Sequence, residues 1–280
     1  MSQLIQVEIA GNSSPAPNIY VLELFAPTLA ANAKPGQFLH IRCAEGTDPL
    51  LRRPVSIHAV NRGTGSVRIM FQVVGQGTEM LARRQDGLLD VIGPLGRGFT
   101  WGQGHPSHTN TGSAAVDGST TNPGGIIVVG GGIGAAPLFF LLQELAVTSA
   151  APRVKVLLGA RSADQLLTVE LAATLGFKVQ IATDDGSAGF HGLVTDLLAE
   201  ELRQKTAHVY ACGPAPMLKA VCTLLGQAKV PGEVSLEERM ACGVGACLSC
   251  VCRVREPGGE ENYQRACVDG PVFSAAEVVW

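Results

Sequence analysis

The sequence predicts a multi-domain protein with an N-terminal antiparallel β-barrel, a central α/β domain on a parallel sheet, and a small C-terminal domain organised by cysteines. Three observations support this prediction. Short apolar stretches separated by turn residues fill the first hundred residues, strands then alternate with helices, and five of the eight cysteines follow residue 241. We therefore expect domains over 1–100, 124–228 and 229–280, with a Gly-, Ser-, Thr- and Asn-rich loop or linker over 101–123.

Composition limits the class of protein. A net charge of −3 without a basic stripe argues against a nucleic-acid partner. Clustered thiols without a disulfide-like distribution, and an N-terminus without a secretory signal pattern, predict a reducing, cytoplasmic location. Residues 124–142 are apolar and uncharged, but their glycines and Pro137 favour a strand, a glycine loop and a helix over a membrane span.

The first hundred residues read as the strands of a barrel. Partly alternating apolar residues are bounded by turn signals such as the Lys34-Pro-Gly-Gln stretch. The predicted strands cover residues 4–10, 18–25, 37–42, 55–60, 66–74 and 88–92.

Two features of this domain suggest a phosphate-bearing cofactor. Arg53 and Ser56 flank a segment stiffened by Pro54, so that a guanidinium can bind a phosphate and a hydroxyl can bond a polar ring edge. Gly77 and Thr78 precede a short helix, with Thr78 as the candidate N-cap, and free N–H groups at a helix start attract phosphate. The alternatives are a surface arginine at the start of a strand and a simple capped turn.

The central domain begins with a buried strand over 126–129, a glycine turn and a helix over 138–147. Strands and helices then alternate, which predicts a parallel sheet with crossover helices. The expected strands are 154–158, 178–182 and 209–212, and the expected helices are 164–175, 193–202 and 217–227.

The glycine turn after the first strand has the G-x-G-x-x-A pattern of dinucleotide binding. The pattern falls on Gly130, Gly132 and Ala135, and the candidate binding residues of the turn are Gly130, Gly132 and Gly134. A turn built only for packing is the alternative. The second strand ends in Arg161 without an acid for a ribose hydroxyl, so that both NAD and NADP stay open.

Two further strand ends belong to the same predicted edge of the sheet, where ligands bind in such folds. One contains Asp184, and the other contains Cys212, Gly213 and Pro214. Cys212 would either meet a nicotinamide ring or be a small buried residue, which is the commoner role of a free cysteine.

The C-terminal cysteines have a specific spacing. Cys242, Cys247 and Cys250 form C-x4-C-x2-C, and Cys267 follows after sixteen residues. This is the plant-type spacing of a [2Fe–2S] cluster, and the glycines between the first two cysteines suit a backbone that wraps around it. Zinc and purely structural cysteines are the alternatives. Cys252 is a fifth thiol nearby and is expected to be packed rather than to be a ligand.

These motifs together resemble a known family. The Arg-Pro-x-Ser segment, the glycine turn and the Cys-Gly-Pro-x-Pro-Met strand end are similar to the ferredoxin–NADP reductase superfamily. The stretches 237–250 and 266–273 resemble the electron-transfer subunit of NAD-dependent dihydroorotate dehydrogenases, and the resemblance spans almost the whole chain apart from 101–123.

The resemblance implies FAD on the barrel, NAD on the central domain and a [2Fe–2S] cluster on the C-terminal domain. It implies that Arg53, Pro54, Val55 and Ser56 hold the flavin and its phosphate. It further implies that Met70, Phe71 and Gln72 line the adenine–ribose side, that Gly77 and Thr78 meet the pyrophosphate, and that Cys242, Cys247, Cys250 and Cys267 bind the cluster.

The same resemblance implies a place in pyrimidine biosynthesis. A separate FMN-containing catalytic subunit would oxidise dihydroorotate, and electrons would run from FMN through the cluster and FAD to NAD⁺. A heterotetramer of two plus two subunits is expected, and this chain alone is not expected to oxidise dihydroorotate. Two alternatives remain: a reductase subunit that serves a sulfide- or ferredoxin-linked enzyme, and a zinc-bound module that senses NAD without being an enzyme.

Overall fold

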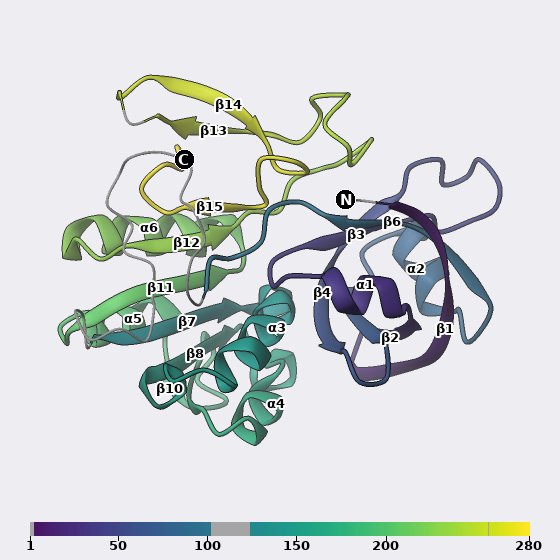
Figure 1. The fold of residues 1–280 in the computed structure, drawn as a ribbon. Helices are drawn as coiled ribbons and strands as arrows, with labels where there is room; N and C mark the ends of the chain where they lie inside the picture. The colour runs from purple at the N-terminus through teal and green to yellow at the C-terminus, as the bar shows by residue number, and fades with distance from the viewer. Residues whose placement is uncertain (1–2, 102–123, 257) are drawn as a thin grey trace.

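The computed structural model describes residues 3–101, 124–256 and 258–280 of the chain. The predicted loop over 101–123 therefore lies, except for Trp101, outside the described residues. Figure 1 shows the β-barrel beside a layered α/β domain, with a two-stranded hairpin at one end of the molecule.

The N-terminal part is a closed antiparallel barrel, as predicted. Its strands follow one another around the barrel in the order β1-β2-β5-β4-β3-β6, and β6 pairs with β1 to close it. Two short helices, α1 (Pro27–Asn32) and α2 (Gln76–Ala82), connect strands. The strands are β1 (Gln3–Ala16), β2 (Ile19–Phe25), β3 (Phe38–Ile41), β4 (Arg53–Asn61), β5 (Ser66–Gln72) and β6 (Leu88–Leu95).

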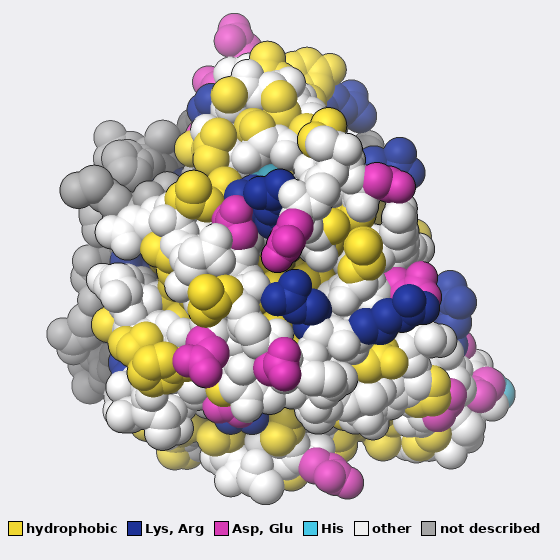
Figure 2. Space-filling model, turned by 90° about the vertical axis from the view of Figure 1, so that its right-hand side faces the viewer, with side chains coloured by type: hydrophobic (Ala, Val, Ile, Leu, Met, Phe, Trp, Pro, Cys, Tyr) yellow, Lys and Arg dark blue, Asp and Glu magenta, His cyan; other side chains and the backbone are white. Residues whose placement is uncertain are grey.

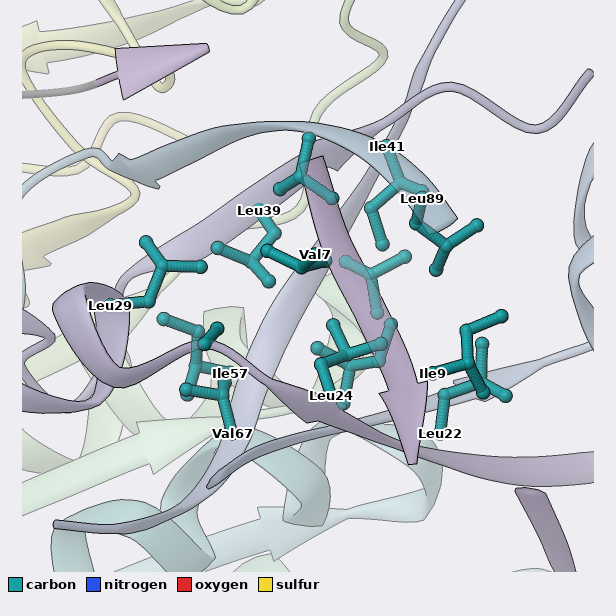
Figure 3. Packing of buried hydrophobic residues seen from close by; sticks show 14 of the residues in the cluster. Val7, Ile9, Leu22, Leu24, Leu29, Leu39, Ile41, Ile57, Val67 and Leu89 are labelled. Atoms are coloured by element: carbon teal, nitrogen blue, oxygen red, sulfur yellow. The ribbon is translucent and has the colours of Figure 1, made fainter. Parts of the chain in front are cut away.

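Aliphatic side chains from alternate strand positions fill the barrel. Figure 3 shows Leu22 and Leu24 of β2 converging with Leu39 and Ile41 of β3 in this core. Because strand residues alternate between faces, the other residues of β3 point out of the barrel. These residues, Phe38 and His40, are nevertheless buried, so a second layer covers the outer face of β3.

The central domain is a seven-stranded sheet in the order β10-β9-β8-β7-β11-β12-β15. All neighbouring strands are parallel except β15, which runs antiparallel to β12. The strands are β7 (Gly125–Gly131), β8 (Val154–Ala160), β9 (Lys178–Thr183), β10 (Phe190–His191), β11 (Thr206–Cys212), β12 (Gly232–Ser235) and β15 (Val272–Ser274).

The helices of this domain are α3 (Ala135–Ala146), α4 (Val169–Thr174), α5 (Val194–Glu201) and α6 (Ala215–Ala228). The predicted helix over 164–175 was wrong in extent. It is divided into a 3-10 turn, Ala163–Gln165, and α4, because Thr168 between them has a left-handed backbone with φ of 64°. No described helix is long and apolar enough to cross a bilayer.

The C-terminal segment consists of a cysteine-bearing loop and a two-stranded hairpin. A loop carries the first three predicted cluster cysteines, and the hairpin of β13 (Val251–Arg255) and β14 (Glu261–Arg265) follows it (Figure 1). Strands β12 and β15, from either side of this loop and hairpin, extend the central sheet. The cysteine-bearing loop is thus anchored to the nucleotide domain at both of its ends.

Candidate functional site: a four-cysteine loop against the barrel

The four predicted cluster cysteines lie together in two pairs. The thiols of Cys242 and Cys247 are within hydrogen-bonding reach of each other, and so are those of Cys250 and Cys267. Cys242 interacts electrostatically with Cys267, which joins the two pairs. In the described residues no three or more Cys, His, Asp or Glu side chains gather around a single metal position. Two pairs fit a two-iron cluster, in which four thiolates serve two irons.

The loop is shaped by glycines with left-handed backbones. Gly243 has φ of 71° and Gly245 has φ of 82°, which residues with a Cβ rarely adopt. This path turns backbone N–H groups toward the first thiol, and Val244 N donates to Cys242 Sγ over 3.4 Å. Burial opposes ionisation of Cys242, but N–H donors from Val244 and neighbouring loop residues lower the pKa of this thiol to about 6.

The remaining thiols are held differently. Burial, together with the neighbouring Cys250 thiol, raises the pKa of Cys267 to about 12. Burial also raises the pKa of Cys252 to about 11, and this thiol donates to the Gln264 carbonyl over 3.5 Å. Cys252 packs in the core between the hairpin and the sheet, with Val254 and Phe273.

The outer face of β3 carries this loop. Phe38 packs with Leu95 of β6 and with Cys250, Ala266 and Cys267 in one buried cluster. The other outward residue, His40, lies under Gly243, since a Cβ built on Gly243 would be 2.3 Å from His40 Nδ1. Burial lowers the pKa of His40 to about 4, and the charge on Arg52 acts in the same direction. The cysteine loop is therefore seated directly on the barrel.

The two barrel features predicted to bind a phosphate-bearing cofactor are brought together. Arg53 begins β4, and its guanidinium lies against Gly77, where a Cβ would come within 2.7 Å of Arg53 Nε. Within the 53–56 segment, Pro54 and Ser56 are half-buried, whereas Val55 points into the barrel core. Val55 can therefore contribute only its backbone to a ligand on the outer face.

The expected N-cap at Thr78 was wrong. Gly75 is the N-cap of α2, and Thr78 is three residues further along. The Thr78 hydroxyl accepts hydrogen bonds from Val74 N and Gly75 N at 3.0 and 3.2 Å, and donates to Gly75 O over 2.9 Å. Thr78 is therefore the third helical residue and not the N-cap. Its hydroxyl bonds back to the turn that precedes the helix.

Residues 70–72 at the end of β5 differ in exposure. Met70 is buried between the barrel and the central domain, in a cluster that includes Phe99. Phe71 points into the barrel core and stacks on Tyr20 with ring centroids 6.1 Å apart. Only Gln72 is exposed. The side chain of Gln72 is the one of the three that is open to an adenine–ribose group.

The predicted nucleotide residues share one edge of the sheet, because β9, β8, β7 and β11 are neighbours and parallel. The two turns at β7 and β11 touch, since a Cβ on Gly134 would be 2.5 Å from Gly213 Cα. Gly132, with φ of 52°, faces open space. Pro214 is the N-cap of α6. The glycine turn thus has a tightly packed side and an open side.

Arg161 and Asp184 lie together at the same edge. Asp184 N donates to Ala160 O, and Asp185 N donates to Arg161 O, each over 3.1 Å. Both predicted side chains, Arg161 and Asp184, are exposed. The positively charged Arg161 and the negatively charged Asp184 therefore lie beside the C-terminal end of β8.

Cys212 is almost completely buried, at 1% exposed. Burial, with the nearby carboxylate of Glu237, raises the pKa of this thiol far above its usual range, so Cys212 is a neutral thiol. Its position at the end of β11, beside Gly213, agrees with either of the roles considered for it.

Sequence reasoning missed the residues that join the domains. His58 of β4 donates through Nδ1 to Ala136 O of α3 over 2.7 Å, and Arg62 pairs with Glu144 over 2.6 Å. Glu233 of β12 accepts from Thr100 N and Thr100 Oγ1, and burial raises its pKa to about 6. The one feature of the sequence that pointed to these contacts was His58, a histidine inside an apolar strand. A histidine in such a strand does not identify its hydrogen-bond partner.

The face shown in Figure 2 carries basic and acidic side chains interspersed with apolar ones, without a continuous basic stripe. The fold and these sites define a class: an NAD(H)-linked oxidoreductase of ferredoxin–NADP reductase build with an additional C-terminal segment, whose predicted four-cysteine cluster site packs against the barrel.

Comparisons with known proteins agree with this class. The family model for the iron–sulfur cluster binding domain of dihydroorotate dehydrogenase B matches residues 237–279, and that for the oxidoreductase NAD-binding domain matches 128–223. The electron transfer subunit of dihydroorotate dehydrogenase B (NAD⁺) from Desulforamulus reducens is 46% identical over the whole of both chains. The corresponding subunit from Geobacillus thermodenitrificans is 43% identical over 94% of each.

Solved structures give the same result. An NADH-dependent reduced ferredoxin–NADP oxidoreductase has a TM-score of 0.79 and 30% identity, covering all of this chain and 92% of that one. A ferredoxin–NADP⁺ reductase from Neisseria gonorrhoeae shares the fold, with a TM-score of 0.62 and 17% identity over 80% of this chain and 91% of that one. The chain belongs to the family of electron-transfer subunits of NAD-dependent dihydroorotate dehydrogenase B, which confirms the predicted resemblance and fold class.

Proposed function

We propose that this chain transfers electrons from the FMN of a dihydroorotate-oxidising catalytic subunit, through a [2Fe–2S] cluster and FAD, to NAD⁺. One observation carries the proposal. The cysteine loop sits on the outer face of β3, and the Arg53–Ser56 segment lies on β4, the neighbouring strand. Adjacent strands of a sheet are about 4.8 Å apart. The cluster and flavin sites are therefore neighbours on one rigid barrel.

The cofactors of the chain are FAD, a [2Fe–2S] cluster and NAD. When bound, FAD would convert between the two-electron hydride exchanged with the nicotinamide and the single electrons carried by the cluster. Cys242, Cys247, Cys250 and Cys267 would hold the irons. The Arg53 guanidinium beside Gly77 would hold an FAD phosphate, with Ser56 on the outer face of the same strand.

The chain's own residues also fix the nucleotide domain against the barrel. The His58–Ala136 hydrogen bond and the Arg62–Glu144 ion pair join β4, which carries the flavin segment, to α3, which follows the glycine turn. The Gly130–Gly134 turn would approach the NAD pyrophosphate from this fixed position, with its open side at Gly132. Arg161 and Asp184 would then border the adenosine end.

In this proposal dihydroorotate oxidation belongs to the partner, and two copies of each subunit form a cytoplasmic heterotetramer. The family assignment supports a catalytic partner, because its members are named as subunits. The clustered, unpaired cysteines support a reducing compartment. Co-expression with the catalytic subunit, followed by light scattering on the purified complex, measures the stoichiometry. A one-to-one dimer would contradict the two-plus-two arrangement.

The first experiment is a visible spectrum of the anaerobically purified chain, with assays for iron, acid-labile sulfide and flavin. We expect flavin bands with a broad reddish shoulder, two irons and one FAD per chain. Dihydroorotate should then reduce NAD⁺ only when the catalytic subunit is added, while the chain alone should pass electrons from NADH to a dye. A colourless, zinc-containing protein would overturn the proposal.

A second candidate function keeps the same electron route with another partner, such as a ferredoxin- or sulfide-linked enzyme. The favouring observation is the 30% identity and full-length coverage of the ferredoxin–NADP oxidoreductase structure. Affinity purification of the tagged chain from its own cells separates the two candidates. Recovery of a dihydroorotate-oxidising FMN protein supports the first, and recovery of a different redox enzyme supports the second.

A further inference from the structure

His40 occupies the junction between the barrel and the cysteine loop. Its neighbours along β3, Leu39 and Ile41, point into the barrel core, so His40 points outward. Its side chain is nevertheless completely buried, at 0% exposed. The cover is the cysteine loop, because a Cβ on Gly243 would lie 2.3 Å from His40 Nδ1 and 3.0 Å from Cε1. The Nδ1 edge of the ring thus faces the residue that follows the first predicted cluster ligand.

The two ring nitrogens of His40 make no hydrogen bond of good geometry to the rest of the described chain. Neither Nδ1 nor Nε2 has a well-aligned hydrogen-bond partner within the described residues, although both atoms are buried. The backbone of Arg52 and that of Cys242 lie close enough to raise the His40 pKa against the larger effect of burial, so the ring is next to the first predicted cluster ligand. An imidazole always carries at least one N–H, and a buried donor without an acceptor is costly. Buried polar groups in native proteins are nearly always paired, and His40, unlike the other buried histidines, lies against the cysteine loop, so its acceptor is sought on the cluster side.

The position of His40 also links the two redox sites. On the barrel His40 is the direct pairing partner of Pro54, inside the Arg53–Ser56 flavin segment. On the other side it meets the loop at Gly243, next to Cys242. The contact requires glycine, since Gly243 has a left-handed backbone and no room for a Cβ. His40 is therefore enclosed between the flavin-binding strand and the start of the cluster loop.

We propose that His40 is a positioning residue for the cluster: its ring N–H, directed at the cysteine loop, donates a hydrogen bond to a sulfur of the [2Fe–2S] cluster or of its Cys242 ligand. This inference rests on the proposed function, because it needs the cluster. Hydrogen bonds to the sulfurs of iron–sulfur clusters help to set their reduction potentials. His40 thereby adjusts the potential of the cluster from the same strand pair that binds the flavin.

The first test uses the wild-type holoprotein labelled with ¹⁵N-histidine. The cluster is reduced, and its paramagnetic resonance is searched for weak coupling to a histidine nitrogen. We expect a coupling in the wild type that disappears in His40→Gln. A cluster signal without any histidine coupling, or a coupling that survives in His40→Gln, overturns the assignment of His40. Absence of any cluster signal overturns the proposed function instead, so the two failures are distinguishable.

The second test is the reduction potential of the cluster in variants that retain two irons and one flavin. His40→Leu removes the donor and should lower the potential, whereas His40→Gln keeps an N–H group and should restore much of it. His208→Leu is the matched control. His208 is 3% exposed, and both of its nitrogens are likewise unpartnered among the described residues, but it lies on β11 of the nucleotide domain.

The control should leave the cluster potential unchanged. An unchanged potential in His40→Leu, or equal shifts in His40→Leu and His208→Leu, overturns the proposal. Where neither His40 variant retains iron, the labelled wild-type protein decides: a histidine coupling supports the inference, and its absence from an intact cluster signal overturns it.

Discussion

Gly134 and Gly213 belong to turns that follow two neighbouring parallel strands, and their backbones touch. A Cβ on Gly134 would lie 2.5 Å from Gly213 Cα and 2.6 Å from Gly213 N. Both atoms belong to Gly213, which directly follows the last residue of β11, so neither can move aside without shifting that strand end. This contact joins the glycine turn to the Cys212-Gly213-Pro214 turn at the predicted NAD site.

Gly134→Ala should damage this site. The added methyl group meets backbone, and overpacking of this kind typically costs about 1–3 kcal/mol of stability. We expect a lower free energy of unfolding in urea and a higher KM for NADH in dye reduction. Gly226→Ala is the control, because nothing lies within 4 Å of a Cβ there and α6 should gain from alanine. A Gly134→Ala variant with wild-type stability and KM would contradict the close contact.

Arg53→Ala should weaken flavin binding. The Arg53 guanidinium is held against Gly77, and loss of a charge-assisted hydrogen bond to a phosphate costs about 1.5–3 kcal/mol. This corresponds to roughly a ten- to hundredfold weaker affinity for FAD, measured by titration of the deflavinated chain. Arg83→Ala, which removes an exposed arginine paired with Glu79 on α2, should bind FAD normally. Equal affinities for the two variants would remove Arg53 from the site.

The local motifs could be predicted from the sequence because each lies within a few consecutive residues. The spacing of Cys242, Cys247 and Cys250 indicated that they converge on a cluster, and the glycine turn indicated a nucleotide-binding edge of the sheet. The alternation of apolar residues gave the barrel strands. These features depend on neighbours along the chain, which the sequence displays directly.

The contacts that connect the motifs could not be predicted in this way. His40 under Gly243, and Glu233 with Thr100, depend on how separate segments pack in three dimensions. Thr78 was misassigned because the register of a short helix is decided by the turn before it. The same limit applies to β15, whose three residues give too short a pattern to place it at the edge of the central sheet.

Cys250→Ala should remove the cluster and leave the flavin. Cys250 is buried, and its thiol lies beside that of Cys267, so the substitution removes one of the four proposed iron ligands. The Arg53–Gly77 contact is made by other segments of the barrel. We expect loss of iron, sulfide and the reddish absorbance, with flavin content and NADH-to-dye reduction close to wild type. Cys222→Ala, on α6, is the control and should retain iron. Simultaneous loss of flavin and iron would contradict separate sites.

Acid should destabilise the fold through its buried histidines, and His208 tests this most directly. Burial lowers the pKa of His208 to about 4. The unfolded chain, with an ordinary histidine pKa near 6.5, therefore binds a proton that the folded chain rejects between these values. Stability from a neutral His208 is fully present above about pH 6.5 and is lost as the pH falls toward 4.

His208→Leu should therefore flatten the pH dependence of stability. The pKa difference corresponds to roughly 3 kcal/mol between pH 7 and pH 4. Urea unfolding at a series of pH values measures it, and the variant should lose less free energy of unfolding over this range than the wild type. Glu233→Gln should have the opposite effect on the pH dependence of stability. Burial raises the Glu233 pKa to about 6, so ionised Glu233 lowers the stability of the wild type as the pH rises. If His208→Leu and the wild type lost equal stability on acidification, His208 would have to be protonated in the fold, and its burial without a hydrogen-bond partner could not be correct.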